Sequence, residues 1–394
     1  MSAVQTLTAA ALPSLACLQL GKRPILVGDE DSFLSTKKAW TAKECVAFDP
    51  ARHIEHTPPS KVYSMSELGY SNSKGVSPIG VSEPFPLFSA EAIWQMRAEV
   101  LSSEVREKYE YSSELAQSQL RGYAAECAPF VYEAWKNPET LAIVSKIAGV
   151  DLVPVMDLEI GHTNLSMSSE ETRSKELVAA VEKKEKKKWE AKDNPQEDES
   201  PIVDWHTDSY PFVCVTMLSD CTDMVGGETA LRKGNGEVVK VRGPQTGWAV
   251  ILQGRYIEHQ ALRALGITER ISMVTSFRPR SSAIQDDTVL TTVRPVSDLG
   301  ELYYQFAEYR FEMLRNRLQD ANNFMRDQKQ AQRRFDTSNL KQFIRAQIDF
   351  LEHMDREIVE DDKVQKGVVD DSHLVSEDLK QKRSQRHVRV AVAE

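Results

Sequence analysis

The sequence predicts a mainly β core, either a sandwich or a barrel, with helices before and after it in a single domain. Between residues 203 and 279, short apolar runs alternate with glycine-rich turns, which is typical of such folds. Helical periodicity is found before and after this stretch. With 394 residues, 41% hydrophobic and 27% charged, the chain is long enough to bury a large core.

The first 85 residues are expected to form an irregular N-terminal arm with a few short elements. Their hydrophobic periodicity is weak, and turn formers such as His56-Thr-Pro-Pro-Ser60 are frequent. The mildly apolar stretch 6–20 has no basic segment before it, so we interpret it as part of the arm rather than as a secretory signal.

Helices are predicted after the arm. Ser89 is a suitable N-cap for a helix with a regular apolar stripe. A second helical pattern covers residues 113–135. A third helix is predicted at 138–148, between the N-cap Asn137 and Gly149, because glycine often follows the last residue of a helix.

The strands of the core come next. Alternation and many β-branched residues predict a strand from Asp151 to Leu165. Residues 168–200 are highly charged and are predicted to be a mobile, solvated excursion, because glutamates are interleaved with the lysines of 182–188. Further strands are predicted at 203–218, 228–233, 237–242, 247–252, 255–259 and 270–278.

A C-terminal helical region is predicted at 298–360, with Ser297 as its N-cap, and we expect it to act as a lid on the core. The tail 361–394 is polar and is predicted to be disordered. Two apolar faces mark the helices, one formed by Leu302, Phe306, Tyr309, Met313 and Leu314, the other by Leu340, Phe343, Ile344, Ile348 and Leu351.

Charge and cysteine content exclude several classes of protein. The net charge of −10 is poorly suited to nucleic acid, so no nucleic-acid partner is expected. The five cysteines are odd in number and contain no Cys-x-x-Cys, which disfavours a disulfide framework or zinc-thiolate site and favours a reducing, cytoplasmic location. No apolar run reaches about 18 residues, so no membrane span is expected. The oligomeric state stays open.

The central chemical motif is Val203-Asp-Trp-His-Thr-Asp-Ser209. His206 and Asp208 are two positions apart on a predicted strand, so their side chains share one face. An imidazole and a carboxylate on one face are two of the three ligands of a facial Fe(II) site. His259, 51 positions after Asp208, is the candidate for the third ligand; the alternative is a core histidine.

A second motif is Arg270-Ile-Ser272. Arg270 and Ser272 also share a strand face, where a guanidinium can bind a carboxylate through two parallel hydrogen bonds and the hydroxyl can add a third. The alternative is a structural ion pair between Arg270 and Glu269.

The order His-x-Asp, about fifty residues, His, ten residues, Arg-x-Ser resembles the Fe(II)/2-oxoglutarate-dependent dioxygenase superfamily, in particular its branch related to isopenicillin N synthase. Gly226-Gly-Glu-Thr229, the strand and turn from Thr246 to Gly254, and Phe277-Arg-Pro279 are similar to segments of that family. The resemblance covers about residues 150–280. It implies a distorted double-stranded β-helix (jelly roll) in one oxygenase domain, residues 86–360.

The resemblance implies that His206, Asp208 and His259 bind Fe(II), and that Arg270 and Ser272 bind the far carboxylate of 2-oxoglutarate. The co-substrates would be 2-oxoglutarate and O2, with ascorbate helpful. The reaction would abstract hydrogen from an unactivated C–H bond and release succinate and CO2, with no separate side-chain acid or base. Candidates for a further contact to 2-oxoglutarate are Asn164 and Thr216.

The layout is also similar to fungal oxygenases of secondary metabolism, among them the aziridine-forming amino-acid oxygenases, which implies a small substrate such as an aliphatic amino acid. A peptide or protein hydroxylase and a non-catalytic jelly-roll binding protein are the alternatives. The residues considered for the substrate are Phe343 and Ile344 on the lid, Arg278 or Arg345 for a carboxylate, and Asp157, Glu159, His162 and Asn164 along one strand, with His162 favoured slightly as a core residue.

Overall fold

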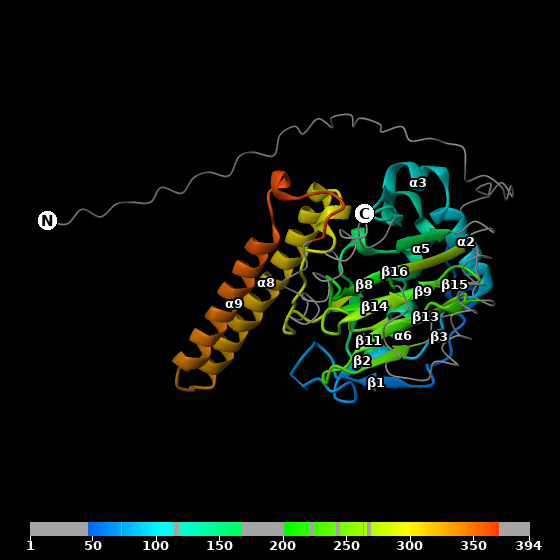
Figure 1. Cartoon of the computed structure of the whole chain (residues 1–394). Coiled ribbons are helices and arrows are strands. Elements are labelled where there is room, and N and C mark those ends of the chain that lie inside the picture. Colours follow the sequence, from blue (N-terminus) through cyan, green and yellow to red (C-terminus); the bar gives the residue numbers. More distant parts are fainter. Residues whose placement is uncertain are drawn as a thin grey trace, which may run out of the picture. The chain divides into compact units, whose positions relative to one another are not determined.

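The computed structural model describes residues 46–369 except 72, 114–117, 168–200, 221–223, 242–244, 263 and 266–268. The predicted charged excursion, most of the predicted tail and the first half of the arm therefore lie outside the described residues. The described residues form two antiparallel sheets with helices around them (Figure 1).

The larger sheet has ten strands. Their order is β1 (Val62–Ser64), β2 (Ile79–Ser82), β13 (Trp248–Leu252), β9 (Phe212–Met217), β16 (Glu269–Pro279), β7 (His162–Met167), β5 (Gln119–Leu120) and β4 (Glu110–Tyr111), with β3 (Phe85–Pro86) beside β13 and β6 (Leu152–Pro154) beside β16.

The smaller sheet has four strands, in the order β12 (Val238–Val241), β11 (Thr229–Arg232), β14 (His259–Leu262) and β8 (Pro201–His206). A separate pair is formed by β10 (Val225–Gly226) and β15 (Ala264–Leu265). Val213 and Val250 of the larger sheet pack against Leu231 and Val241 of the smaller one, so the two sheets face each other across an apolar layer. This arrangement confirms the predicted jelly-roll core.

Helices cover the outer face of the larger sheet. The side chains that alternate with the inner set, such as Phe212 and Met273, are fully buried against Phe130 and Trp135 of α5 (Pro129–Lys136). Burying each such side chain contributes about 1.5–3 kcal/mol. The other helices before the core strands are α1 (Pro50–His53), α2 (Ala90–Val100), α3 (Ser103–Tyr109), α4 (Ala124–Cys127) and α6 (Pro138–Ala148).

Two predicted helices are confirmed together with their ends. The Ser89 side chain accepts a hydrogen bond from the backbone N–H of Ala92 at the start of α2. The Asn137 side chain accepts from Glu139 N–H at the start of α6, and Gly149 ends that helix with φ 70°.

Several boundaries differ from prediction. The predicted strand 203–218 is two strands, because β8 ends at His206 and a turn containing Pro211, which has no N–H to donate, leads into β9. Residues 255–258 form a turn, and β14 starts at His259. The segment 113–135 contains β5, α4 and α5, and the segment 151–165 contains β6, the 3-10 helix η1 (Asp157–Glu159) and part of β7.

The C-terminal region is a hairpin of two antiparallel helices, α8 (Leu299–Gln330) and α9 (Thr337–Glu357), set between the 3-10 turns η2 (Arg294–Val296) and η3 (Asp361–Lys363) (Figure 1). The end of this hairpin nearest the core packs through Leu302, Phe306, Phe350 and Met354. The N-cap of α8 is Asp298, which accepts from Glu301 N–H, and not Ser297, whose hydroxyl donates to Val293 O. Among the described residues, no helix is long and apolar enough to cross a membrane.

Candidate metal centre

The pairing of β8 with β14 brings His206 and His259 together. The two residues lie directly opposite each other in the antiparallel register. Directly opposite residues in a sheet point to the same face. Their ring centroids are 4.3 Å apart, with 52° between the ring planes. The histidine that follows Asp208 by about fifty positions therefore returns beside the first one.

Asp208 completes the group from the turn after β8, rather than from the strand that the sequence predicted. Its Oδ1 lies 3.6 Å from Nε2 of His206 and 3.5 Å from Nε2 of His259. One ligand atom from each of the three residues lies within 4.8 Å of the others. Ligands bound at about 2.1 Å and at right angles would be about 3 Å apart. A small contraction would thus bring all three onto one divalent cation.

Backbone contacts fix how these side chains are presented. Nδ1 of His259 donates to the carbonyl of Ile257 at 2.9 Å, which leaves its Nε2 lone pair directed at the group. The backbone N–H of Asp208 donates to the Gly254 carbonyl at 3.0 Å. Oδ2 of Asp208 is buried and has no hydrogen-bond partner among the described residues. A buried carboxylate oxygen without a donor suits a cation.

Gly254 is required for sterics at this site. A Cβ at that position would lie 1.8 Å from Oδ2 and 2.7 Å from Cγ of Asp208. Only a glycine allows the carboxylate to occupy its present position, which gives a physical reason for the glycine at the end of the 246–254 segment.

The charges of the group favour the deprotonated carboxylate. Burial alone would raise the pKa of Asp208, but the imidazoles of His259 and His206 outweigh it and hold that pKa far below its usual range. Burial lowers the pKa of His259, but the Asp208 carboxylate more than offsets this, so the pKa is raised overall. A bound cation would take the place of the proton that Asp208 draws to this ring.

The register of β16 places the second motif on the face that looks toward the smaller sheet. Arg270 pairs with Ser166 and Ser272 with Asn164 of β7, so all four lie on the same face as Val274, which packs in the layer between the sheets. Asn164 therefore shares a face with the predicted anion clamp. Glu269, the alternative partner of Arg270, forms an ion pair with Arg97 at 2.8 Å instead.

Thr216 lies on the wrong face for the same role. It pairs with Met273, whose side chain is buried in the outer core beneath the helices. Alternation along the strand puts neighbouring residues on opposite faces. The prediction that Thr216 could contact 2-oxoglutarate is thus wrong, and Asn164 keeps its candidacy.

Arg278 lies on the same inner face as Arg270, at the other end of β16. Phe277 pairs with Phe212, the first residue of β9, so this end adjoins the turn that carries Asp208. The guanidinium carbon of Arg278 lies 4.8 Å from the centroid of the Tyr309 ring, and Nη1 donates to Pro279 O at 3.3 Å. Its buried Nε has no hydrogen-bond partner, and no carboxylate among the described residues forms an ion pair with it.

His162 lies on this same face, opposite Val274, and belongs to a buried polar network. Arg121 donates to its Nδ1 at 3.0 Å, and its Nε2 lies 3.1 Å from Oε1 of Gln119. Arg121 also forms an ion pair with Glu159, which accepts a hydrogen bond from Tyr210 at 2.9 Å. Burial and then Arg121 hold the pKa of His162 well below its ordinary value, so the ring is neutral with both nitrogens engaged.

The sequence missed Gln119 and Arg121 because residues 113–135 were interpreted as a helix. In the structure, β5 places Gln119 opposite Asn164, so its side chain reaches the inner face. Asp157, in contrast, lies on η1 at the surface, where it binds Tyr132 and Lys136. It does not line the metal centre, contrary to prediction.

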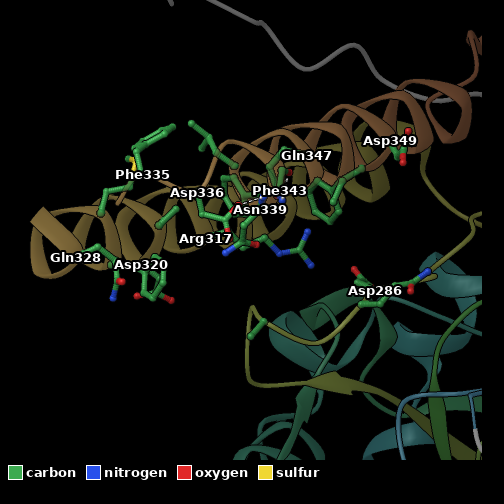
Figure 2. A pocket seen from close by; sticks show the side chains of 18 of the residues that line it. Asp286, Arg317, Asp320, Gln328, Phe335, Asp336, Asn339, Phe343, Gln347 and Asp349 are labelled. Atoms are coloured by element: carbon green, nitrogen blue, oxygen red, sulfur yellow. Dashed lines mark hydrogen bonds between the residues drawn. The ribbon is translucent and has the colours of Figure 1, made fainter. Parts of the chain in front are cut away.

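Phe343, Ile344 and Arg345 lie on α9, far along the helix from the end that packs on the core. Figure 2 shows Phe343 at the seam of the two helices, with Asp286 across the groove on the side of the β core. That groove has a volume of about 1390 Å³ and is lined by α8, α9 and residues 283–287. Ile344 and Arg345 are exposed. The structure does not bring these three residues to the metal-ligand group.

The hairpin nevertheless contacts the loop that carries Asp208. Ser209 O accepts a hydrogen bond from Val289 N–H at 2.9 Å. The following residue, Leu290, donates its N–H to the Glu357 carboxylate of α9 at 2.6 Å. On the other side, Asp286 is bound by Arg310 of α8 at 3.1 Å. The segment 286–290 thus connects both helices to the turn that carries Asp208, which we call the metal loop.

Comparisons with known proteins find no matching family model and no curated protein similar in sequence. Solved structures do match, among them a non-haem α-ketoglutarate-dependent epimerase, SnoN, from nogalamycin biosynthesis (14% identity, 49% of this chain and 75% of that one, TM-score 0.33). A prolyl-4-hydroxylase of Pseudomonas putida matches at 15% identity over 49% of this chain and 88% of its own, with a TM-score of 0.30. The non-haem monooxygenase ThoJ matches at 13% over 54% and 78%, with a TM-score of 0.32. All three TM-scores are below 0.5, and function is inferred below from the geometry of this chain alone.

Proposed function

We propose that this chain is an Fe(II)/2-oxoglutarate-dependent oxygenase of the superfamily that the sequence resembles. The observation that carries the proposal is the convergence of His206, Asp208 and His259, with ligand atoms within 4.8 Å of one another. Two imidazoles and one carboxylate, with no fourth His, Cys, Asp or Glu in the group among the described residues, form the donor set of an open facial Fe(II) site.

Bound Fe(II) would supply the redox chemistry with O2 that converts 2-oxoglutarate to succinate and CO2 and oxidises a C–H bond of the substrate. The role of the protein is to hold the reactants and to exclude water. Arg270 and Ser272 would bind the far carboxylate of 2-oxoglutarate, because they share the face that looks toward the smaller sheet, which carries His206 and His259. Asn164, opposite Ser272, would add an amide contact. Ascorbate would keep the metal reduced.

The proposed substrate is a small molecule with a carboxylate, such as an aliphatic amino acid. Arg278 supports this proposal: it is a partly buried cation beside the Asp208 turn, and no described carboxylate offsets its charge. Its position at the end of β16 opposite to Arg270 would keep the two anions apart. Hydroxylation, desaturation and ring closure are all compatible with this arrangement.

We also propose a cytoplasmic location. Cys127 and Cys214 are free thiols, and Cys214 is buried in the core, which fits a reducing compartment.

The experiment that tests the proposed function is succinate formation from 2-oxoglutarate with Fe(II), O2 and ascorbate, using a pool of amino acids and a pool of short peptides. We expect turnover with the wild type and none with His206→Ala or Asp208→Ala, while His56→Ala, outside the metal group, stays active. Stimulation by peptides alone would favour a peptide hydroxylase. A folded, metal-loaded chain that forms no succinate with either pool would favour a binding protein and contradict the proposal.

A further inference from the structure

The outer side of the α8–α9 hairpin carries exposed apolar side chains at a spacing of seven residues. Tyr304, Phe311, Leu318 and Met325 of α8 are 39–66% exposed. Residues seven apart drift by only about 20° around a helix, so these four form one stripe. An exposed apolar stripe of this length is typical of an interaction surface.

The second helix extends the same surface. Ile344, Ile348 and Leu351 of α9 are 41–48% exposed. Arg310 of α8 and Phe350 of α9 face each other, with the guanidinium carbon 3.6 Å from the ring centroid. Phe311 directly follows Arg310, and Leu351 directly follows Phe350. Each therefore points about 100° further around its own helix than the contact residue before it. In an antiparallel pair this puts both stripes on the same side, away from Leu302, Phe306 and Met313, which pack on the core.

Charge is distributed unevenly along the hairpin. The tip, residues 313–345, has eight basic and three acidic side chains, a net charge of +5. The two segments that form the base, residues 298–312 and 346–357, together have eight acidic and two basic side chains, a net charge of −6. A surface that is basic at one end and acidic at the other is complementary to a copy of itself turned end to end.

We propose that a second copy of this chain docks on this surface, with the two hairpins antiparallel in a two-fold symmetric dimer. The stripe on α8 fits such a dimer because antiparallel pairing places Phe311 opposite Leu318 and Tyr304 opposite Met325 of the other copy. Each basic tip then lies on the acidic base of its partner. The proposal does not depend on the proposed oxygenase activity.

The size of the surface is sufficient. From residue 304 to residue 325 a helix rises about 32 Å, and two helices side by side are about 20 Å wide, which gives roughly 600 Å² for each copy. The smallest stable interfaces bury about this area on each side. The base of the hairpin holds segment 286–290 next to the metal loop, so a partner on the hairpin would also brace that segment.

Sedimentation velocity of the full chain at about 10 μM tests the proposal. The wild type is expected to sediment with twice the mass of one chain, and Phe311→Asp/Leu318→Asp with the mass of one chain. Asn316→Asp/Asn323→Asp is the matched control: it adds the same two charges, also seven residues apart, at exposed positions on another side of α8, and it should leave the dimer intact. Circular dichroism of each variant reports whether the helices are retained.

A charge-swap pair covers the case in which the apolar variant loses its helices. Glu301 and Arg326 are both exposed, lie on the same side of α8, and would come within two residues of register across the antiparallel interface. Arg326→Glu is expected to weaken the dimer about tenfold at low salt, and Glu301→Arg in the same chain should restore it. A wild-type chain that is monomeric at 10 μM, a folded Phe311→Asp/Leu318→Asp variant that stays dimeric, or a swap that does not restore the dimer would each overturn the proposal.

Discussion

Gly254→Ala should remove metal binding without unfolding the chain. The added methyl carbon would lie 1.8 Å from Oδ2 of Asp208, whereas non-bonded heavy atoms approach to about 3.5 Å. The carboxylate must therefore move by more than about 1 Å, while ligand distances in metal sites vary by only about 0.2 Å. Changes that merely disturb the support of a ligand weaken binding by about 10- to 100-fold. We expect at least about 100-fold weaker Co(II) or Mn(II) binding.

The assay is isothermal titration of the chain with Mn(II) under conditions where thermal melts show that the fold is retained. The overpacking should cost about 1–3 kcal/mol of unfolding free energy. Gly300→Ala is the matched control, because a Cβ there meets its nearest neighbour, Oδ1 of Asp298, at 3.4 Å, and it lies in the first turn of α8. An unchanged Mn(II) affinity in Gly254→Ala would refute the view that this glycine sets the position of Asp208.

Three further changes test other parts of the account. Arg270→Ala should raise the 2-oxoglutarate concentration needed for half-maximal succinate formation by about tenfold or more, because the carboxylate loses a bidentate partner. Arg278→Leu should leave that concentration unchanged. The reverse pattern would mean that Arg278 binds 2-oxoglutarate and Arg270 binds the substrate. Glu357→Ala leaves the N–H of Leu290 and the Arg294 guanidinium without their carboxylate. The unfolding free energy measured in urea should therefore fall by about 2–4 kcal/mol. A loss below about 0.5 kcal/mol would contradict the view that Glu357 holds the segment 286–290 on the hairpin. Burial raises the pKa of Glu99 to about 7, although Val131 and Phe130 N–H groups oppose it. In the folded chain this carboxyl keeps a proton that the unfolded chain releases from about pH 4.5 upward. The unfolding free energy of the wild type, compared with that of Glu99→Gln, should therefore fall as pH rises toward 7, by up to about 3 kcal/mol. A difference between the two proteins that does not change with pH would contradict this prediction.

Local patterns predicted the parts of the fold that depend on local physics. Ser89, Asn137 and Gly149 cap their helices because side-chain oxygens and a left-handed glycine satisfy free backbone groups at helix ends. The order and spacing of His-x-Asp, His and Arg-x-Ser, through the family resemblance that they carry together, singled out three residues that the structure then brings together.

Features that depend on non-local register could not be predicted. Asn164 and Thr216 were equal candidates in the sequence, and only the pairing of β16 with β7 and β9 separates them by face. The buried ion pair between Arg121 and Glu159 joins residues 38 positions apart, with no periodic pattern to connect them. Periodicity also showed an apolar face on α9 but not what packs against it, so Phe343 and Ile344 were assigned to the substrate although they lie along the hairpin.

Metal stoichiometry distinguishes a shared iron site from two histidines that only lie close together. Anaerobic equilibrium dialysis against Fe(II) should find one ion per wild-type chain, and none in His259→Ala, the variant that removes the imidazole supplied by the distant strand, while its far-UV circular dichroism stays that of the wild type. Retention of the full Fe(II) content by folded His259→Ala would mean that the two strands do not build a shared iron site.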